Sequence, residues 1–569
     1  MPIHSLYPPL PPVPDANVVH TMFGRPDQAE WPDYTIHVEE KTGRKRTYKH
    51  FLKQVELGAT ALGAKLSHGG LGLNGDGDEM IGLMGDNSLE YIDIILSLLM
   101  VTTPFALISA YSTRFELVHA LKVTKVTRVF VDAKLLDNVL AAIEDPDVHI
   151  TPDKIYILSG QPVNGRKSFG QIVDLVMRNK VPLEPVRPAK KDTLAYLLMS
   201  SGTSGLPKAV MITHGNDTFS HYQLTVINQL AVPFLGPRAT MQIIVGVLPM
   251  FHTYGLHAYV LRATLAPATY VILEKWNTVQ YLKTITKYRA TTLTLIPSAI
   301  HQLVNHPDIK TTDLSSVNII ISGAAYLPPE LAAQMKSFLN EKSVVEQMYG
   351  LSESTLVPFT RPTEGMLNMP ANTTGILVPG LTARIVREDG TDAATGEAGE
   401  LWLRGDNIVR GYWNNSQANA NTFVDGWLRT GDRFSADAKG YFFFADRAKD
   451  TLKVSGTQVS PMEIEDVLFA HPEKLISDVS VAGVSGGRTD DEKVPRAWIV
   501  LSSSGQKKGP AAVITALEQW HRESLSKYKW LRGGIEVVKE IPKTPTGKIM
   551  RRVLQEEYER RAKKSWAKL

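Results

Sequence analysis

Cysteine is absent from the 569-residue chain. Its absence excludes disulfide frameworks, cysteine nucleophiles, iron–sulfur clusters and every zinc site that depends on cysteine ligands. Any thiol that takes part in the chemistry of this protein must therefore come from another molecule.

Strong net charge and long apolar runs are lacking as well. The 62 basic and 58 acidic residues give a formal net charge of +4, which does not predict a nucleic-acid partner. The longest apolar stretch, residues 91–110, contains Asp93 and Pro104 and indicates a buried helix and strand. The first residues lack the charged start and apolar core of a secretory signal. We expect neither a transmembrane segment nor nucleic-acid binding.

What the chain does have is the composition and length of a globular protein with several domains. Hydrophobic residues make up 43% and charged residues 21%, and 569 residues exceed the usual size of one domain. Apolar runs rich in β-branched residues alternate with helical patterns, which indicates an α/β fold with parallel sheets. The clearest runs are residues 80–84, 128–131, 155–158, 243–248 and 292–296. After Thr382, short strand-like pieces separated by Gly and Asp predict a β-rich subdomain.

A second, smaller domain is predicted at the C-terminal end. We place the boundary at residues 445–447, so that residues 1–445 form a large N-terminal domain of stacked α/β subdomains and residues 446–569 a small mobile α+β domain. Ser460, Pro461 and Glu463 predict a helix start with a capping box. The remaining elements are expected as strands at 476–484, 497–501 and 535–538, a helix at 513–524 and a basic helix after residue 547.

Two short motifs fit known patterns but stand in the wrong context. Residues 70–75 (GLGLNG) match a dinucleotide fingerprint, yet the required strand-then-helix order is reversed. Residues 483–487 (GVSGG) match the nucleophile elbow of serine hydrolases, yet a charged loop follows where a helix must begin. We interpret both as ordinary turns.

The segment 196–208 has the chemistry of a phosphate-binding loop. A strand-like run leads into hydroxyls and glycines and ends at Lys208. Glycines let backbone amides approach anionic oxygens, hydroxyls donate hydrogen bonds, and the lysine adds a point charge. The spacing is not that of a Walker loop, and alone such a segment is more often a plain linker.

Further motifs follow this loop in a fixed order. They read LPMFHTYGL, SGAA, QMYGLSE, WLRTGD, DRAKD with KVSG, and PTGK, beginning at residues 248, 322, 347, 427, 446, 453 and 545. The ordered set resembles the adenylate-forming acyl-CoA synthetases, most closely the branch of 4-coumarate:CoA ligases and luciferases. The resemblance covers residues 35 to 555 approximately.

The resemblance implies a reaction in two halves and a set of site residues. A carboxylate attacks the α-phosphate of ATP with Mg²⁺ bound, and coenzyme A then captures the acyl-adenylate. It implies that Glu353 helps to bind Mg²⁺, that Lys548 acts in adenylation and that Asp432 accepts hydrogen bonds from the ribose. The ATP and AMP contacts implied are Ser201, Gly202, Thr203, Ser204, Gly205, Lys208, Gly323, Ala324, Tyr349, Gly350, Ser352, Asp432 and Arg447.

The same resemblance implies a rotation of the small domain about Lys449. Rotation would withdraw Lys548 and present Lys453, Ser455 and Gly456 to coenzyme A, with Lys453 counted among the catalytic residues. Many relatives read Lys-Tyr-Lys-Gly where this chain reads KVSG, so the contacts to coenzyme A differ in detail.

The acid is expected in a pocket beside His252, which we also count as catalytic. The acyl-binding residues implied are His252, Tyr254, Ala258, Gly323, Gly350, Leu356 and Val357. Tyr326 and Met348 depart from the usual Pro and Gly of the family and add bulk near this pocket. We predict an aryl acid of the 4-coumarate, cinnamate or benzoate type, or a medium-chain fatty acid.

Two questions stay open from the sequence. The acyl group could pass to a carrier protein or to oxygen, as in luciferases, instead of to coenzyme A. The last residues, Ala567, Lys568 and Leu569, are a variant of the Ser-Lys-Leu peroxisomal address, so we predict a peroxisomal import receptor as partner, with a cytoplasmic location as the alternative.

Overall fold

The fold comes from a computed structural model. It describes residues 2–75, 79–200, 207–235, 241–355, 357–360, 370, 372–447, 452–454, 457–485, 493–525, 527–544, 547 and 549–566. Within these residues, no helix combines the length and apolar character needed to cross a membrane.

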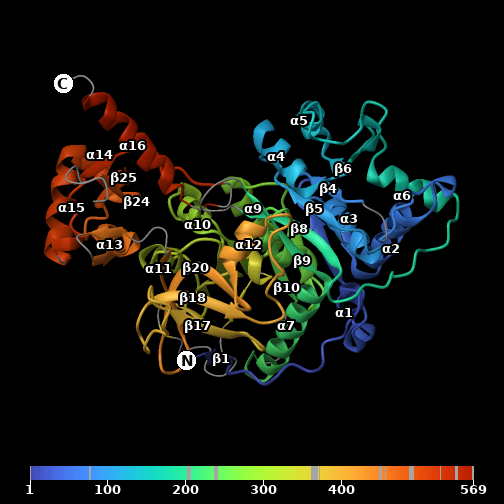
Figure 1. Ribbon diagram of the computed structural model, residues 1–569, viewed down its shortest axis with the longest axis horizontal. Coiled ribbons are helices and arrows are strands. Elements are labelled where there is room, and N and C mark those ends of the chain that lie inside the picture. The colour runs from blue at the N-terminus through green and yellow to red at the C-terminus, as the bar shows by residue number, and fades with distance from the viewer. Residues whose placement is uncertain are drawn as a thin grey trace.

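The first large sheet has six strands, all parallel except the last pair (Figure 1). Its inner strands are buried on both faces, as their continuous apolar sequences require. In sheet order the strands are β7 (Ile155–Ile157), β6 (Arg128–Val131), β4 (Ile81–Met84), β5 (Phe105–Ile108), β8 (Leu194–Ser200) and β9 (Lys208–Thr213). The helices that precede or connect them are α2 (Tyr48–Gly63), α3 (Leu89–Met100), α4 (Arg114–Thr124), α5 (Leu136–Ala142) and α6 (Phe169–Arg178).

The second sheet has seven strands and is parallel apart from its terminal hairpin. In order these are β14 (Val344–Gln347), β13 (Ile319–Ser322), β12 (Thr292–Leu295), β10 (Gln242–Gly246), β11 (Ala268–Ile272), β2 (Thr35–Glu39) and β3 (Lys45–Thr47). The accompanying helices are α1 (Val18–Phe23), α7 (His214–Leu235), α8 (Thr253–Leu256), α9 (Thr278–Tyr288), α10 (Pro297–Val304) and α11 (Pro329–Lys336).

The third sheet is antiparallel and contains the N-terminal arm, which lies next to β17 in Figure 1. Its strands are β1 (Ile3–His4), β17 (Thr382–Val386), β18 (Gly399–Arg404), β20 (Trp427–Ala436), β21 (Phe442–Arg447), β16 (Thr373–Leu377) and β15 (Phe359–Thr360), with β19 (Phe423–Val424) beside β20 and helix α12 (Ser416–Thr422) before it. The predicted β-rich region after Thr382 therefore forms.

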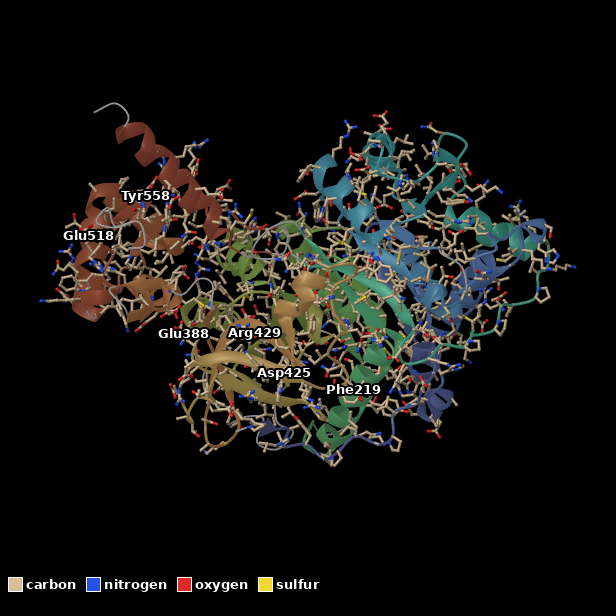
Figure 2. All side chains as sticks on the ribbon, in the orientation of Figure 1. Phe219, Glu388, Asp425, Arg429, Glu518 and Tyr558 are labelled. Carbon is tan, nitrogen blue, oxygen red and sulfur yellow. The ribbon has the colours of Figure 1, made fainter. Side chains whose placement is uncertain are left out.

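The C-terminal residues form a separate lobe with its own apolar core. Figure 1 shows this lobe beside α10, in orange and red, and Figure 2 labels Glu518 and Tyr558 on it. It comprises the hairpin β22 (Leu452–Val454) and β23 (Thr457–Val459), the sheet β24 (Ile476–Ser485), β25 (Lys493–Leu501) and β26 (Ile535–Val537), and helices α13 (Pro461–Phe469), α14 (Ser503–Lys508), α15 (Pro510–Ser524) and α16 (Arg551–Trp566). The domain boundary at 445–447 stays a prediction, and β21 runs through these residues.

One local prediction is wrong. Helix α13 begins at Pro461 as expected, but Ser460 makes no capping hydrogen bond with its side chain. The Ser460 hydroxyl instead donates to the Ala445 carbonyl at 3.4 Å, and Glu463 pairs with Lys529. The tertiary contacts of the hydroxyl and the carboxylate thus replace the local capping box.

Candidate functional site

The candidate site is a cavity of about 670 Å³ where the second sheet, the third sheet and the C-terminal lobe meet. Strands β10, β12, β13 and β14 are parallel, so the residues that follow them converge at one edge of the sheet, where open α/β sheets bind ligands. The main lining segments are residues 248–255, 296–298, 323–326, 347–353, 428–432, 461–466 and 547–551, several of them only in part.

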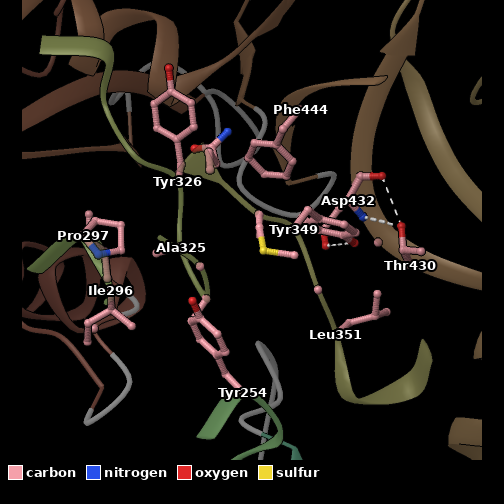
Figure 3. A pocket seen from close by; sticks show the side chains of 18 of the residues that line it. Tyr254, Ile296, Pro297, Ala325, Tyr326, Tyr349, Leu351, Thr430, Asp432 and Phe444 are labelled. Carbon is pink, nitrogen blue, oxygen red and sulfur yellow. Dashed lines mark hydrogen bonds between the residues drawn. The ribbon is translucent and has the colours of Figure 1, made fainter. Parts of the chain in front are cut away.

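One wall carries a carboxylate held by an aromatic residue. The Tyr349 hydroxyl donates to Asp432 Oδ2 at 2.7 Å, and the Asp432 amide donates to Thr430 Oγ1 at 3.2 Å (Figure 3). The Tyr349 ring stacks on Phe444 with 6.2 Å between ring centroids. This wall presents an aromatic face beside a fixed hydrogen-bond acceptor. Such a pair suits a planar base that is attached to a sugar with hydroxyl groups.

A second group of lining residues combines a lysine and a glutamate through one tyrosine. The Tyr412 hydroxyl donates to Glu353 Oε1 at 2.8 Å, and the Lys208 ammonium lies 4.8 Å from the centroid of the Tyr412 ring. Burial in the cavity is the main cause that raises the pKa of Glu353, and the Tyr412 hydrogen bond acts against it. Tyr412 therefore orients the carboxylate and contacts the cation at once.

The turn that carries Glu353 is fixed by hydrogen bonds to backbone carbonyls. The Val409 amide donates to the Glu353 carbonyl at 3.0 Å, and the Asn407 side chain donates to the Ser354 carbonyl at 3.0 Å. Thr355 has a left-handed backbone with φ of 50°, and its hydroxyl donates to the Asn407 carbonyl at 2.5 Å. The glutamate thus sits on a constrained support, as a preorganised ligand should.

Apolar and neutral groups line the deeper part of the cavity. Burial lowers the pKa of His252 to about 4, so its imidazole is neutral at pH 7. The Tyr254 hydroxyl donates to the Ile321 carbonyl at 3.0 Å, which holds its ring against Gly323. A Cβ atom on Gly323 would lie 3.0 Å from Tyr254 Cε1, so glycine leaves room that alanine would fill.

Comparison with known proteins identifies the family. A model described as AMP-binding enzyme matches residues 25–413, and a model described as AMP-binding enzyme C-terminal domain matches residues 463–548. The chain belongs to the AMP-binding enzyme family. The resemblance to adenylate-forming acyl-CoA synthetases that the motifs indicated is confirmed, and the chain is an adenylate-forming acid:CoA ligase.

Curated relatives and solved structures support the assignment to the AMP-binding enzyme family. "Probable 4-coumarate--CoA ligase 1" of Dictyostelium discoideum is 33% identical over 68% of this chain and 67% of its own. "Peroxisomal OPC-8:0-CoA ligase 1" of Arabidopsis thaliana is 28% identical over 96% of this chain and 94% of its own. The solved structure of anthranilate CoA ligase AuaEII in complex with anthranoyl-AMP superposes with a TM-score of 0.81, 25% identity, and coverage of 98% and 99%. The predicted fold class is confirmed.

The cavity of this AMP-binding enzyme contains many of the residues implied by the motifs. Those that line it are Lys208, His252, Tyr254, Gly323, Ala324, Tyr349, Gly350, Ser352, Glu353, Val357 and Asp432. Ala258 does not line the cavity, since it lies in the short helix His257–Leu261 and packs against the core. Arg447 and Lys453 are described by their backbones alone, in β21 and β22.

Several implied residues lie outside the described residues. They are Ser201, Gly202, Thr203, Ser204, Gly205, Leu356, Lys449, Ser455, Gly456, Lys548, Ala567, Lys568 and Leu569. Gly547 is described and lines the cavity, and it directly precedes Lys548 in the chain.

Three contributors to the site are not indicated by the motifs. Tyr412, the start of α10 and Asp466 of the C-terminal lobe all line the cavity. Tyr412 stands in a Gly-Tyr pair between predicted strands and carries no chemical signal by itself. The contributions of α10 and Asp466 depend on how distant segments pack, which local sequence does not report.

Proposed function

We propose that this acid:CoA ligase acts on a hydrophobic carboxylic acid of the aryl type, such as 4-coumarate, cinnamate or benzoate, or on a medium-chain fatty acid. The main observation behind this proposal is that three features share one cavity. They are the pair Lys208 and Glu353, the Tyr349–Asp432 wall and the apolar surface around Tyr254. Relatives named for 4-coumarate and anthranilate support the aryl class.

In this proposal the nucleotide lies between two walls of the cavity. Tyr349 contacts the adenine and Asp432 accepts from the ribose hydroxyls, while Lys208 neutralises phosphate oxygens together with the loop at residues 201–205. Ser352 and the residues around Gly323 and Gly350 complete this side. Arg447, which pairs with Asp432 in the β20–β21 ladder, would assist at the ribose.

Glu353 fits the role of a Mg²⁺ ligand. No cluster of three or more His, Asp or Glu suited to a metal occurs among the described residues, so an all-protein metal cage is not found there. Mg²⁺ commonly uses one or two carboxylates plus substrate phosphates, and Glu353 supplies such a carboxylate. The ion would neutralise charge on the phosphates.

The acid would lie with its carboxylate near His252 and its apolar part beside Tyr254 and Gly323. A neutral imidazole can donate a hydrogen bond to the carboxylate without forming an ion pair that must later be broken. Met348 lines the same cavity and would set its width.

We infer two successive displacements over this one cavity. A carboxylate oxygen bonds to the α-phosphorus and pyrophosphate leaves, and the coenzyme A sulfur then bonds to the acyl carbon and AMP leaves. Lys548 would serve the first step and the segment Lys453 to Gly456 the second, with Lys449 as the pivot. Since the chain has no cysteine, the sulfur belongs to coenzyme A and not to an acyl-enzyme.

The deciding experiment is a panel of carboxylic acids scored for AMP release with and without coenzyme A. We expect release with aryl or medium-chain acids that depends on coenzyme A and yields a thioester. AMP release that instead needs a carrier protein or oxygen would assign the second half-reaction to that acceptor. Release with short polar acids alone would refute the proposed substrate class.

A further inference from the structure

A hydrogen bond between two side chains joins the wall of the cavity to the C-terminal lobe. The Tyr326 hydroxyl donates to Asp466 Oδ2 at 2.9 Å, across 140 positions of sequence. Tyr326 follows β13 in the loop that leads to α11, and Asp466 lies in α13. Both residues line the cavity, and in Figure 3 the Tyr326 hydroxyl points away from Tyr254.

The partner of Asp466 lies in the other part of the molecule, whereas the acidic neighbours of Asp466 have basic partners within the C-terminal lobe. Glu463 pairs with Lys529, and Glu465 pairs with Arg551 at 2.7 Å, both within the C-terminal lobe. Among the described residues, Asp466 forms no ion pair, and the Tyr326 phenol is its side-chain donor. Burial, with Glu465, Glu330 and Glu463 adding to it, raises the pKa of Asp466 to about 7, and the phenol opposes the rise. A buried carboxylate that loses its donor is costly.

A second contact exists in the same orientation of the lobe. Gly547 has φ of 80°, and a Cβ atom there would lie 2.6 Å from Ser298 Oγ and 2.8 Å from Ile296 Cδ1, at the start of α10. Gly547, which directly precedes Lys548 in the chain, is therefore packed closely against the cavity wall. The Tyr326–Asp466 bond and the contact of Gly547 with α10 join the large part to the C-terminal lobe at two different points. Two separate contacts fix the orientation of the lobe as well as its distance from the large part.

We propose that Tyr326 and Asp466 form an interdomain clasp that holds the C-terminal lobe in the orientation that brings the Gly547 segment to the cavity, which makes Tyr326 a positioning residue for adenylation. The proposal rests on the adenylation role given to Lys548 above. The family resemblance places a proline at position 326, and proline has no hydroxyl to donate. The clasp is thus a property of this chain, and it must open before the lobe can rotate.

The test uses the absence of cysteine. In the full chain, Lys439→Cys in the large part and Thr515→Cys in the C-terminal lobe introduce the only two thiols, both at exposed positions. Two dyes attached to these thiols report the distance between the large part and the lobe. Glu518, on the same helix as Thr515, is labelled in Figure 2. In this background Tyr326→Phe, Asp466→Ala and the double variant are compared, because alanine has no acceptor oxygen for the Tyr326 hydroxyl. Tyr288→Phe and Glu473→Ala are the matched controls distant from the clasp.

At pH 8, above the pKa of about 7 of Asp466, the acceptor is mostly ionised. We therefore expect each single variant to lower the ratio of docked to undocked molecules by about tenfold, as for one hydrogen bond to a charged group. The double variant should lower it no further, because both changes remove the same bond. Acid-dependent exchange of ATP with pyrophosphate should fall with it, whereas thioester formation from supplied acyl-adenylate should not.

Three results would overturn the clasp: an unchanged distance distribution, a Tyr326→Phe effect with Asp466→Ala silent, or additive effects in the double variant. The second result would assign Tyr326 to the acyl pocket alone. The distance measurement needs no turnover, so it tests the clasp independently of the proposed substrate class. If that substrate class is wrong, the wild-type protein gives no exchange with any aryl or medium-chain acid, whatever the distance measurement shows.

Discussion

At the scale of single residues, the cavity places the cation of Lys208, the oriented carboxylate of Glu353 and the neutral imidazole of His252 around the expected reacting groups. Lys208 supplies the positive charge, Tyr412 fixes the direction of Glu353, and burial keeps His252 uncharged. A carboxylate and a polyphosphate repel each other, so the catalytic problem is the positioning and neutralisation of negative charge. Lys208, Glu353 and His252 each contribute differently to this positioning and neutralisation of charge.

Removal of the Tyr412 hydroxyl should release Glu353 while keeping the aromatic face under Lys208. We predict that Tyr412→Phe lowers the rate of acid-dependent exchange of ATP with pyrophosphate about tenfold and raises the Mg²⁺ concentration needed for half the maximal rate. A hydrogen bond to a charged group contributes roughly 1.5–3 kcal/mol, which sets that magnitude. Tyr288→Phe, on α9 away from the cavity, is the control, and an unaltered Mg²⁺ requirement in Tyr412→Phe would argue against the role of this tyrosine.

His252 should not change charge across neutral pH. Its pKa in the folded chain is about 4, below the usual 6.5, so between these values the unfolded chain binds the proton more readily. The contribution of this imidazole to the free energy of unfolding is therefore fully present above pH 6.5 and is lost as pH falls to 4. We predict that His252→Gln lowers the exchange rate by a constant factor between pH 6 and 8. A factor that varies across pH 6.5 would show instead that His252 titrates there.

At the scale of elements, the site is a consequence of parallel strands. β10, β12, β13 and β14 deliver successive loops to one edge of the second sheet, and the loop residues there carry the chemistry. The C-terminal lobe closes the same edge with the turn at Gly547 and with α13.

Gly547 is predicted to be irreplaceable for docking and dispensable for folding. Gly547→Ala places a Cβ atom against Ser298 and Ile296 at a left-handed backbone position, and we expect adenylation to fall at least tenfold. Gly534→Ala is the matched control, because its φ of 81° imposes a similar backbone strain of roughly 1–2 kcal/mol, with Arg496 Nη1 at 3.4 Å as its nearest contact. Equal rates of exchange in the two variants would show that strain, not docking, is the cause.

Much of the element order follows from the sequence because buried strands and amphipathic helices have distinct periods. The run 128–131 forms β6 with the same bounds, and residues 91–110 form most of α3 and all of β5. Side-chain partnerships were less predictable: Ser460 bonds to Ala445 and not to its own helix, and Tyr412 reaches Glu353 from 59 positions away. Such contacts depend on the packing of distant segments, so local pattern cannot specify them.

At the scale of the whole molecule, the chain is two parts that share one cavity. The large part contains the proposed nucleotide and acyl walls, and the C-terminal lobe contributes Asp466 and Gly547 to the lining of the cavity. Rotation of the lobe would let the same cavity serve both displacements, and the Tyr326–Asp466 bond would be made and broken once per cycle.

We propose that the C-terminal tripeptide determines where the protein is located and takes no part in its chemistry. A relative named as a peroxisomal ligase supports a peroxisomal address in Ala567, Lys568 and Leu569. We predict that deletion of these three residues leaves the activity of the purified protein unchanged and disperses a fluorescent fusion into the cytosol. Unchanged punctate localisation of the truncated fusion would remove the targeting proposal.

Formation of an acyl-AMP is the most direct test of the central claim. Purified protein, ATP, Mg²⁺ and a mixture of aryl and medium-chain acids are incubated without coenzyme A, and the products are identified by mass spectrometry before and after coenzyme A is added. We predict an acyl-AMP that disappears into an equal amount of acyl-CoA, and at least a hundredfold less acyl-AMP from Lys548→Ala. If no acid yields an acyl-AMP with the wild-type protein, the proposed two-step chemistry over this cavity is wrong.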